Sequence, residues 1–133
     1  MPMSRVPKEQ VVKQLTNVEL EIMQILWSLG EGSVHHVLDK LPPERKLAYT
    51  SVSTMLRILE QKGVVEAKKV GRGHHYLPRL KKEEFEANSV AQLVQKVFND
   101  TPSYLVRTLL SVKNLSKDEL DEIKALIETK AAE

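Results

Sequence analysis

The sequence contains no cysteine among its 133 residues. This absence excludes disulfide bonds, thiolate zinc sites, iron–sulfur clusters and cysteine nucleophiles together. No apolar run approaches the roughly 18 residues that a membrane-spanning helix needs. The opening stretch, MPMSRVPKEQ, has no apolar segment typical of a signal peptide. We therefore expect a cytoplasmic protein that does not insert into a membrane.

Aromatic residues are scarce, at 5% of the chain. Proteins that bind single-stranded nucleic acid stack bases on aromatic side chains, so this class is disfavoured. The GxSxG, HExxH and P-loop motifs are absent, and no Ser/His/Asp spacing indicates a nucleophile. We expect neither an enzyme nor a cofactor. With 41% hydrophobic and 29% charged residues, the composition is typical of a soluble globular protein with one modest core.

The charge is unevenly distributed although the net charge is only +2. Residues 1–82 carry 14 Lys/Arg against 8 Asp/Glu, whereas residues 83–133 carry 6 against 10. The net charge of the first part is therefore +6 and that of the second part is −4. Such asymmetry indicates two parts with different partners, of which the basic one suits a polyanion and the acidic one a protein.

Hydrophobic periodicity predicts two helices near the start of the chain. Thr16 and Glu19 form a capping-box pattern that opens the first helix, and Gly30 ends it. Ser33 is the predicted cap of a short second helix, which ends before Pro42-Pro43 because proline cannot continue it.

The third predicted helix is capped by Thr50 and ends at Gly63. Residues 45–49 before it could form a brief strand. The helix has one apolar face, made by Val52, Met55, Leu56 and Leu59. The opposite face is polar and presents Ser53, Thr54, Arg57 and Gln61.

After Gly63 the period of the apolar pattern changes from about 3.6 residues, typical of a helix, to 2, typical of a strand. Residues 64–71 alternate as a strand does, and residues 74–77 form a second short run ended by Pro78. Gly71-Arg72-Gly73 lies between them, so the two strands are predicted to form a β-hairpin.

The remainder of the chain is predicted to form three short amphipathic helices. Asn99-Asp100 ends the first, Thr101-Pro102 opens the second, and Ser116 with Glu119 forms a capping-box pattern at the third. This segment is too small to fold as a separate domain. Its apolar faces either pack back on the preceding part or form a dimer interface, which we expect to include Leu93, Val97, Phe98, Leu105, Leu109, Leu120, Ile123 and Ile127.

Three helices followed by a hairpin is the element order of a winged helix-turn-helix. The predicted fold is mainly α with a small β-hairpin wing, divided into a DNA-binding domain at 1–80 and a helical dimerisation segment at 81–133. In this fold the second helix of the helix-turn-helix pair enters the major groove of double-stranded DNA. Its exposed hydroxyls and Arg57 could contact phosphates or bases.

Basic residues concentrate in the hairpin region, with eight Lys/Arg against two Glu between Arg57 and Lys82. Lys68 and Lys69 would bind phosphates without reading sequence, and Arg72 at the turn would reach the DNA backbone or minor groove. Taken alone, a basic hairpin can equally be a solvated surface. Trp27 and Tyr49 are interpreted as packing residues.

The four histidines occur as two adjacent pairs, His35-His36 and His74-His75. Adjacent side chains point in different directions, so neither pair forms a ready chelate and no metal site is expected. Two alternatives to DNA binding remain open. One is a winged helix used as a protein-interaction module, and the other is a metal-responsive regulator that uses these histidines.

Two long motifs carry a resemblance to a known family. They are LTNVELEIMQILWSLGEGSVHHVLDKL and AYTSVSTMLRILEQKGVVEAKKVGRGHHYLP. Over about residues 15–130 the chain resembles the BlaI/MecI repressors of penicillinase and methicillin-resistance genes, a family that also includes copper-transport repressors. The resemblance implies a transcriptional repressor that binds an inverted-repeat operator as a homodimer.

The resemblance also implies roles for individual residues. By position, Thr50, Ser51, Ser53, Thr54 and Arg57 correspond to the recognition helix, and Arg72 to the wing. Several family members are inactivated when a protease controlled by a membrane sensor cuts an Asn-Phe bond in the C-terminal segment. Here the corresponding bond is Thr108-Leu109, with different residue types. The copper-responsive branch uses a C-terminal cysteine cluster, which this chain lacks.

Overall fold

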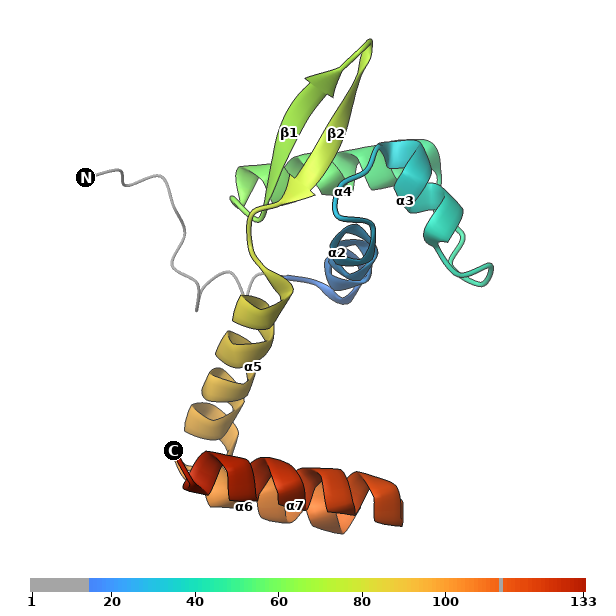
Figure 1. The fold of residues 1–133 in the computed structure, drawn as a ribbon. Helices are drawn as coiled ribbons and strands as arrows, with labels where there is room; N and C mark the ends of the chain where they lie inside the picture. Colours follow the sequence, from blue (N-terminus) through green and yellow to red (C-terminus); the bar gives the residue numbers. More distant parts are fainter. Residues whose placement is uncertain (1–14, 113) are drawn as a thin grey trace, which may run out of the picture. The chain divides into compact units, whose positions relative to one another are not determined.

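The computed structural model describes residues 15–112 and 114–133, so the expectation about the first ten residues lies outside the described part. The chain divides into an N-terminal unit up to Gln92 and a C-terminal unit from Leu93. The elements are α2 (Asn17–Leu29), α3 (Val34–Lys40), α4 (Tyr49–Gln61), β1 (Val65–Val70), β2 (Gly73–Pro78), α5 (Lys82–Val97), α6 (Pro102–Val112) and α7 (Lys117–Ala131). The predicted fold, mainly helical with one hairpin that stands out from the helices, is confirmed (Figure 1).

The predicted starts of the first two helices are confirmed by their caps. The Thr16 hydroxyl accepts from the Glu19 N–H at 3.1 Å, and Glu19 Oε1 accepts from the Thr16 N–H at 2.8 Å. Ser33 caps α3 in the same reciprocal way with His36 as its partner. Gly30 ends α2 at φ 87°, a conformation that glycine adopts without strain.

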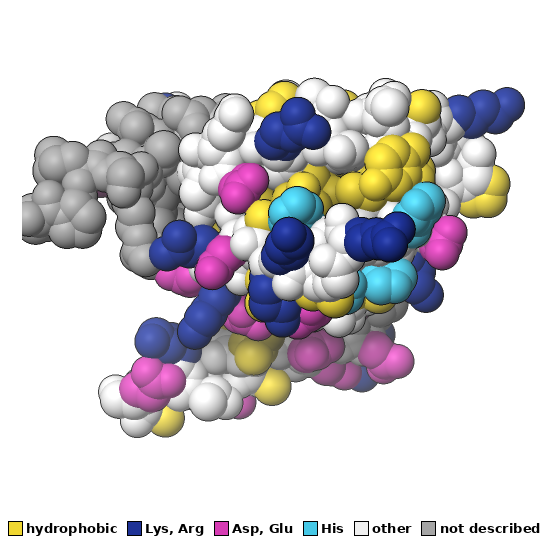
Figure 2. Space-filling view, turned by 90° about the horizontal axis from the view of Figure 1, so that it is seen from above, with side chains coloured by type: hydrophobic (Ala, Val, Ile, Leu, Met, Phe, Trp, Pro, Cys, Tyr) yellow, Lys and Arg dark blue, Asp and Glu magenta, His cyan; other side chains and the backbone are white. Residues whose placement is uncertain are grey.

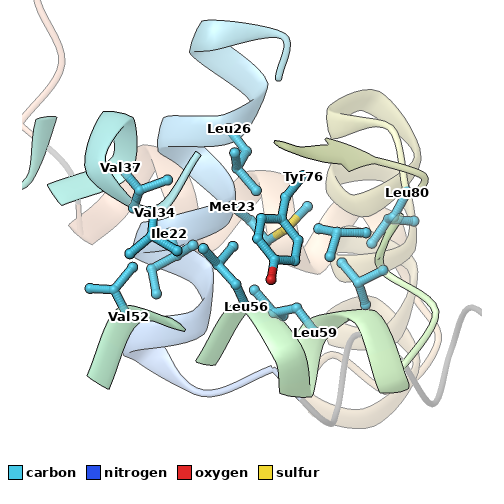
Figure 3. Packing of buried hydrophobic residues seen from close by; sticks show 12 residues of the cluster. Ile22, Met23, Leu26, Val34, Val37, Val52, Leu56, Leu59, Tyr76 and Leu80 are labelled. Atoms are coloured by element: carbon cyan, nitrogen blue, oxygen red, sulfur yellow. The ribbon is translucent and has the colours of Figure 1, made fainter. Parts of the chain in front are cut away.

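The core of the N-terminal unit lies between the three helices and the base of the hairpin. Ile22, Met23 and Leu26 on α2 are completely buried, and so are Val52, Leu56 and Leu59, the inward face predicted for α4. Figure 3 shows the ring of Tyr76, which comes from the hairpin, among these side chains. The hairpin is therefore part of the core as well as a projection from it.

The hairpin is antiparallel and pairs Val65 with Pro78 and Val70 with Gly73. A third chain segment joins it at one point: the Gly32 N–H donates to the Tyr76 carbonyl at 3.1 Å, and the Tyr76 N–H donates to the Gly32 carbonyl at 2.8 Å. A Cβ on Gly32 would lie 3.2 Å from the Cβ of His36, so only glycine fits this approach without a shift of its neighbours.

The possible strand at residues 45–49 is wrong. Residues 45–48 form an irregular connection in the described chain, and Gly32 occupies the position beside β2. The connection is held through its side chains instead. Arg45 Nη2 donates to Glu21 Oε1 at 2.7 Å, and Leu47 packs against the core.

The predicted cap of the third helix is also wrong. Helix α4 begins at Tyr49, so Thr50 lies in its first turn, and the N-cap is Ala48. Among the described residues no side chain makes a cap hydrogen bond to this helix end. The first-turn N–H groups of α4 are therefore without a side-chain acceptor.

A buried ion pair joins the start of α2 to the end of α4. Lys62 Nζ lies 2.8 Å from Glu19 Oε1 and 3.0 Å from Oε2, with the Glu19 side chain 6% exposed. Burial by itself raises the pKa of Glu19, but the hydrogen bonds from Lys62 and the Thr16 N–H, together with the lysine charge, outweigh it. The pKa of Glu19 therefore lies below its ordinary value of 4.5.

The C-terminal unit contains little buried surface. Asn99 and Asp100 both adopt positive φ, at 53° and 56°, and end α5 as predicted. Ser116 caps α7 by accepting from the Glu119 N–H at 3.1 Å. Neither α6 nor α7 has a buried residue within the described chain. No described helix is long and apolar enough to cross a membrane.

We predict that Lys62→Met lowers the free energy of unfolding by about 3 kcal/mol, because it leaves the buried Glu19 carboxylate without its lysine. Urea denaturation measures the change. The matched control is the double variant Glu19→Gln/Lys62→Met, which buries no charge and keeps a capping-box residue at position 19, so it should recover most of the loss. A single variant as stable as the wild type would contradict this assignment.

The same ion pair predicts a pH dependence of stability. Because the pKa of Glu19 is lower in the folded chain than in the unfolded one, its contribution is complete above about pH 4.5 and is lost as the pH falls through the folded value. Urea midpoints measured on either side of pH 4.5 should therefore fall less steeply with acid in Glu19→Gln than in the wild type. If the urea midpoints of the two proteins fell equally with pH, the Glu19 carboxylate would not be responsible for the loss of stability in acid.

Candidate nucleic-acid interface

A groove with a volume of about 500 Å³ lies between α3, α4 and the hairpin. Figure 2 looks onto this side of the molecule and shows Lys, Arg and His side chains gathered around a hydrophobic hollow. The groove is lined by Ser33, Val34, His35, Tyr49, Ser53, Arg57, Glu60, Ala67, Val70, Arg72, Gly73, His74, His75 and Tyr76. It combines an apolar floor with polar and cationic walls.

Helix α4 places two of the predicted reading residues in this groove. Ser53 and Arg57 are one helical turn apart and both line it. Thr54 and Thr50 are exposed on α4 but do not line the groove, and Ser51 is only partly exposed. The predicted polar face is therefore present, with Ser53 and Arg57 closest to the hairpin.

The hairpin supplies the second wall. Arg72 lies in the turn after Gly71, whose φ of 60° suits glycine, and both are exposed. Lys69 is exposed on β1. The neighbouring Lys68 is also exposed, but its Nζ lies 3.5 Å from Glu31 Oε1. An exposed guanidinium and an exposed ammonium on one hairpin suit the phosphates of a duplex.

Glu31 connects the hairpin to the turn before α3. Its Oε2 lies 2.8 Å from His75 Nδ1. The hydrogen bond with His75 lowers the pKa of Glu31 most, and the Lys68 charge adds to this against a smaller opposing effect of burial. Glu31 is therefore a carboxylate at neutral pH that partly neutralises the base of the hairpin.

One residue in the basic stretch has a different role from the one that charge counting suggests. Lys62 belongs to the eight cations counted between residues 57 and 82, yet it forms the buried ion pair with Glu19. Its charge therefore stabilises the fold and is not part of the groove.

Most of the groove residues were not predicted as site residues, and His35, Tyr49 and His74 are among them. Tyr49 is 48% exposed, and its ring centroid lies 4.8 Å from that of His35, so it packs at the surface of the groove and is not part of the core. The sequence does carry a signal for Tyr49. Counting in helical turns from Arg57 through Ser53 leads to Tyr49, but only if the helix begins one residue before the predicted cap.

Trp27 packs as predicted. Its Nε1 donates to the Leu80 carbonyl at 2.8 Å, and its ring lies 5.6 Å from that of Phe85. Tyr76 forms the groove floor with its ring in the core. Burial, and then the charge of Glu60, raise the pKa of Tyr76, so its hydroxyl is neutral at physiological pH.

Two of the four histidines are engaged in hydrogen bonds within the fold. His36 Nδ1 accepts from the Ser33 N–H at 3.1 Å, and His75 is paired with Glu31. Across residues 15–112 and 114–133, no group of three or more His, Asp or Glu side chains is arranged to hold a metal ion.

The residues predicted to form a dimer interface differ in exposure. Leu93, Val97, Leu109, Leu120 and Ile127 are exposed, whereas Phe98, Leu105 and Ile123 are partly exposed. Exposed apolar side chains on one segment indicate a surface that a partner could cover.

Comparison with known proteins identifies relatives of this chain. A family model described as penicillinase repressor matches residues 15–129. The transcriptional regulator BlaI of Mycobacterium tuberculosis is 31% identical over 120 residues, which cover 89% of this chain and 86% of that protein. The penicillinase repressor of Bacillus licheniformis is 24% identical over 117 residues, covering 88% and 91% of the two chains.

A solved structure has the same fold. The hsRosR-S4 complex superposes with a TM-score of 0.54 at 19% identity, covering 95% of this chain and 97% of that chain. At this level of identity the likeness concerns the fold alone.

Proposed function

The chain belongs to the penicillinase-repressor family, as its motifs suggested, and from that premise we propose that it represses transcription by binding an inverted-repeat operator as a homodimer. Members of this family are DNA-binding transcriptional repressors and not enzymes. The observation that carries the proposal for the binding surface is the groove in which Ser53 and Arg57 of α4 lie opposite Arg72 of the hairpin. Such a repressor would act in the cytoplasm.

In the proposed complex α4 enters the major groove. Ser53, Thr54 and Arg57 would contact base edges, and a guanidinium can form a two-pronged hydrogen bond with guanine. Thr50 and Ser51 lie in the first turn, whose N–H groups have no side-chain acceptor among the described residues and could bind a phosphate. Lys69 and Arg72 would neutralise phosphates along the flanking backbone, and Lys68 would contribute less because Glu31 lies beside it.

The proposed dimer rests on the exposed apolar residues of the C-terminal unit. Val97 is 65% exposed and Ile127 is 56% exposed, and α6 and α7 bury no residue of their own within the described chain. Covering each such side chain contributes about 1.5 to 3 kcal/mol. One winged helix covers only a half-site, and two copies related by a two-fold axis match an inverted repeat. We therefore assign residues 1–80 to DNA binding and residues 81–133 to dimerisation.

The proposed release mechanism is cleavage by a regulatory protease at Thr108-Leu109. The bond lies inside α6, where the Thr108 carbonyl accepts from Ser111 Oγ at 3.0 Å. A protease binds its substrate extended, so the helix would have to open locally. Because α6 has no buried residue among those described, such an opening costs little packing energy.

We predict that Arg57→Ala and Thr54→Ala weaken binding to the operator by about tenfold or more while changing binding to a scrambled duplex much less, because base contacts carry specificity. Lys69→Ala should weaken binding to both duplexes alike. It should also reduce the slope of log affinity against log salt concentration by about one, because one fewer phosphate is neutralised. Fluorescence anisotropy at two salt concentrations measures both effects. If all three variants bind the operator as the wild type does, the reading surface is assigned wrongly.

We predict that Ile127→Asp shifts the dimer toward monomer by at least about tenfold in dissociation constant, because a carboxylate replaces an apolar group in the interface. Lys124→Asp, an exposed position on the same helix, is the matched control and should leave the dimer intact. Sedimentation velocity over a range of concentrations distinguishes them. Equal behaviour of the two variants would exclude α7 from the interface.

A further inference from the structure

Three side chains in the groove have no role in the proposed reading of DNA. His35 comes from α3, Tyr49 from the first turn of α4 and His74 from β2, so three of the elements around the groove contribute one each. His35 and His74 are exposed, and Tyr49 is 48% exposed. The rings of His35 and Tyr49 lie 4.8 Å apart. The fold thus brings together residues that are far apart in the sequence.

These two histidines differ from the other two in their surroundings. His36 accepts the cap hydrogen bond from Ser33, and His75 is bound to Glu31. Among the described residues, no hydrogen bond or ion pair engages the ring nitrogens of His35 or His74. Their N–H groups are therefore available to a ligand that enters the groove.

The remaining groups around the groove determine which ligand charge fits. Every adjacent element contributes titratable or charged groups: Arg57 and Glu60 from α4, Arg72 from the turn, Tyr76 and the Glu31-bound His75 from β2, and Lys68 on β1 beside Glu31. Two fixed guanidinium charges face one carboxylate, so the groove is cationic before any histidine is protonated. A phosphodiester accepts hydrogen bonds but donates none, which matches imidazolium, guanidinium and phenol donors.

We propose that His35, Tyr49 and His74 form, together with Arg72, a binding site for phosphodiester groups of DNA at which binding takes up protons. This inference rests on the proposed function. A histidine ordinarily titrates near pH 6.5, within the range of cell chemistry. A bound phosphate favours the protonated imidazole, so by linkage the affinity for DNA rises as the pH falls through this range and levels off in acid.

The test measures operator affinity of the full chain by fluorescence anisotropy between about pH 8 and pH 5.5 at fixed salt. The wild type should gain about tenfold in affinity for each of the two histidines over this range. His35→Gln and His74→Gln should each remove about half of the logarithmic gain, and the double variant should be nearly independent of pH.

His36→Gln is the matched control. It removes a histidine that does not line the groove, and glutamine three residues after Ser33 preserves the capping box. Its pH dependence should equal that of the wild type. Tyr49→Phe removes only a neutral hydroxyl, so it should lower affinity a few-fold at every pH without changing the pH dependence.

The outcomes separate this inference from the proposed function. Operator binding whose affinity does not change with pH, or whose pH dependence survives in the double variant, would overturn the inference and leave the repressor function standing. A pH dependence that is lost in His36→Gln as much as in His35→Gln or His74→Gln would also overturn it. Failure of the wild type to bind any duplex over the whole pH range would overturn both.

Discussion

The position of Tyr76 determines where the hairpin lies relative to the helices of the N-terminal unit. Tyr76 is 8% exposed, and its ring packs in the same cluster as Met23, Leu56 and Leu59 (Figure 3). Its backbone exchanges two hydrogen bonds with Gly32 in the turn before α3. Side chain and backbone therefore fix β2 to both α2 and α3. As a result, Arg72 at the far end of the hairpin faces the same groove as the exposed side of α4.

The cations of the basic segment divide between folding and binding. Lys62 pairs with the buried Glu19 and joins α2 to α4, and Lys68 lies beside Glu31. Arg57 and Arg72 line the groove instead, and Lys69 is exposed next to it. Internal pairing thus removes charge where the chain packs and leaves it where a polyanion would bind. Local charge density from sequence overstates the number of cations available to DNA, because it does not distinguish these two groups.

Much of the fold follows from local sequence signals. The capping boxes at Thr16 and Ser33, the inward face of α4 and the hairpin around Gly71 depend on residues close together in the chain, and local patterns predict them.

The errors in the sequence-based prediction arise from contacts between residues far apart in the chain. Gly32 pairs with Tyr76, 44 residues away, whereas residues 45–48 are irregular. Thr50 matches the pattern of a cap, yet α4 starts earlier at Tyr49. Because of that single-residue error, the helix face that Tyr49 shares with Ser53 and Arg57 in the groove was not predicted. Lys62 could not be assigned to an ion pair because Glu19 lies 43 positions before it.

The central claim is that one surface, formed by the outer face of α4 and the hairpin, holds double-stranded DNA. An NMR titration of the full chain with an operator duplex, following backbone amide shifts, tests this most directly. The account predicts that the largest shifts occur at Tyr49, Ser53, Arg57, Arg72 and His74, with residues 114–133 nearly unchanged. Shifts concentrated in the C-terminal unit, or spread evenly over the chain, would contradict it.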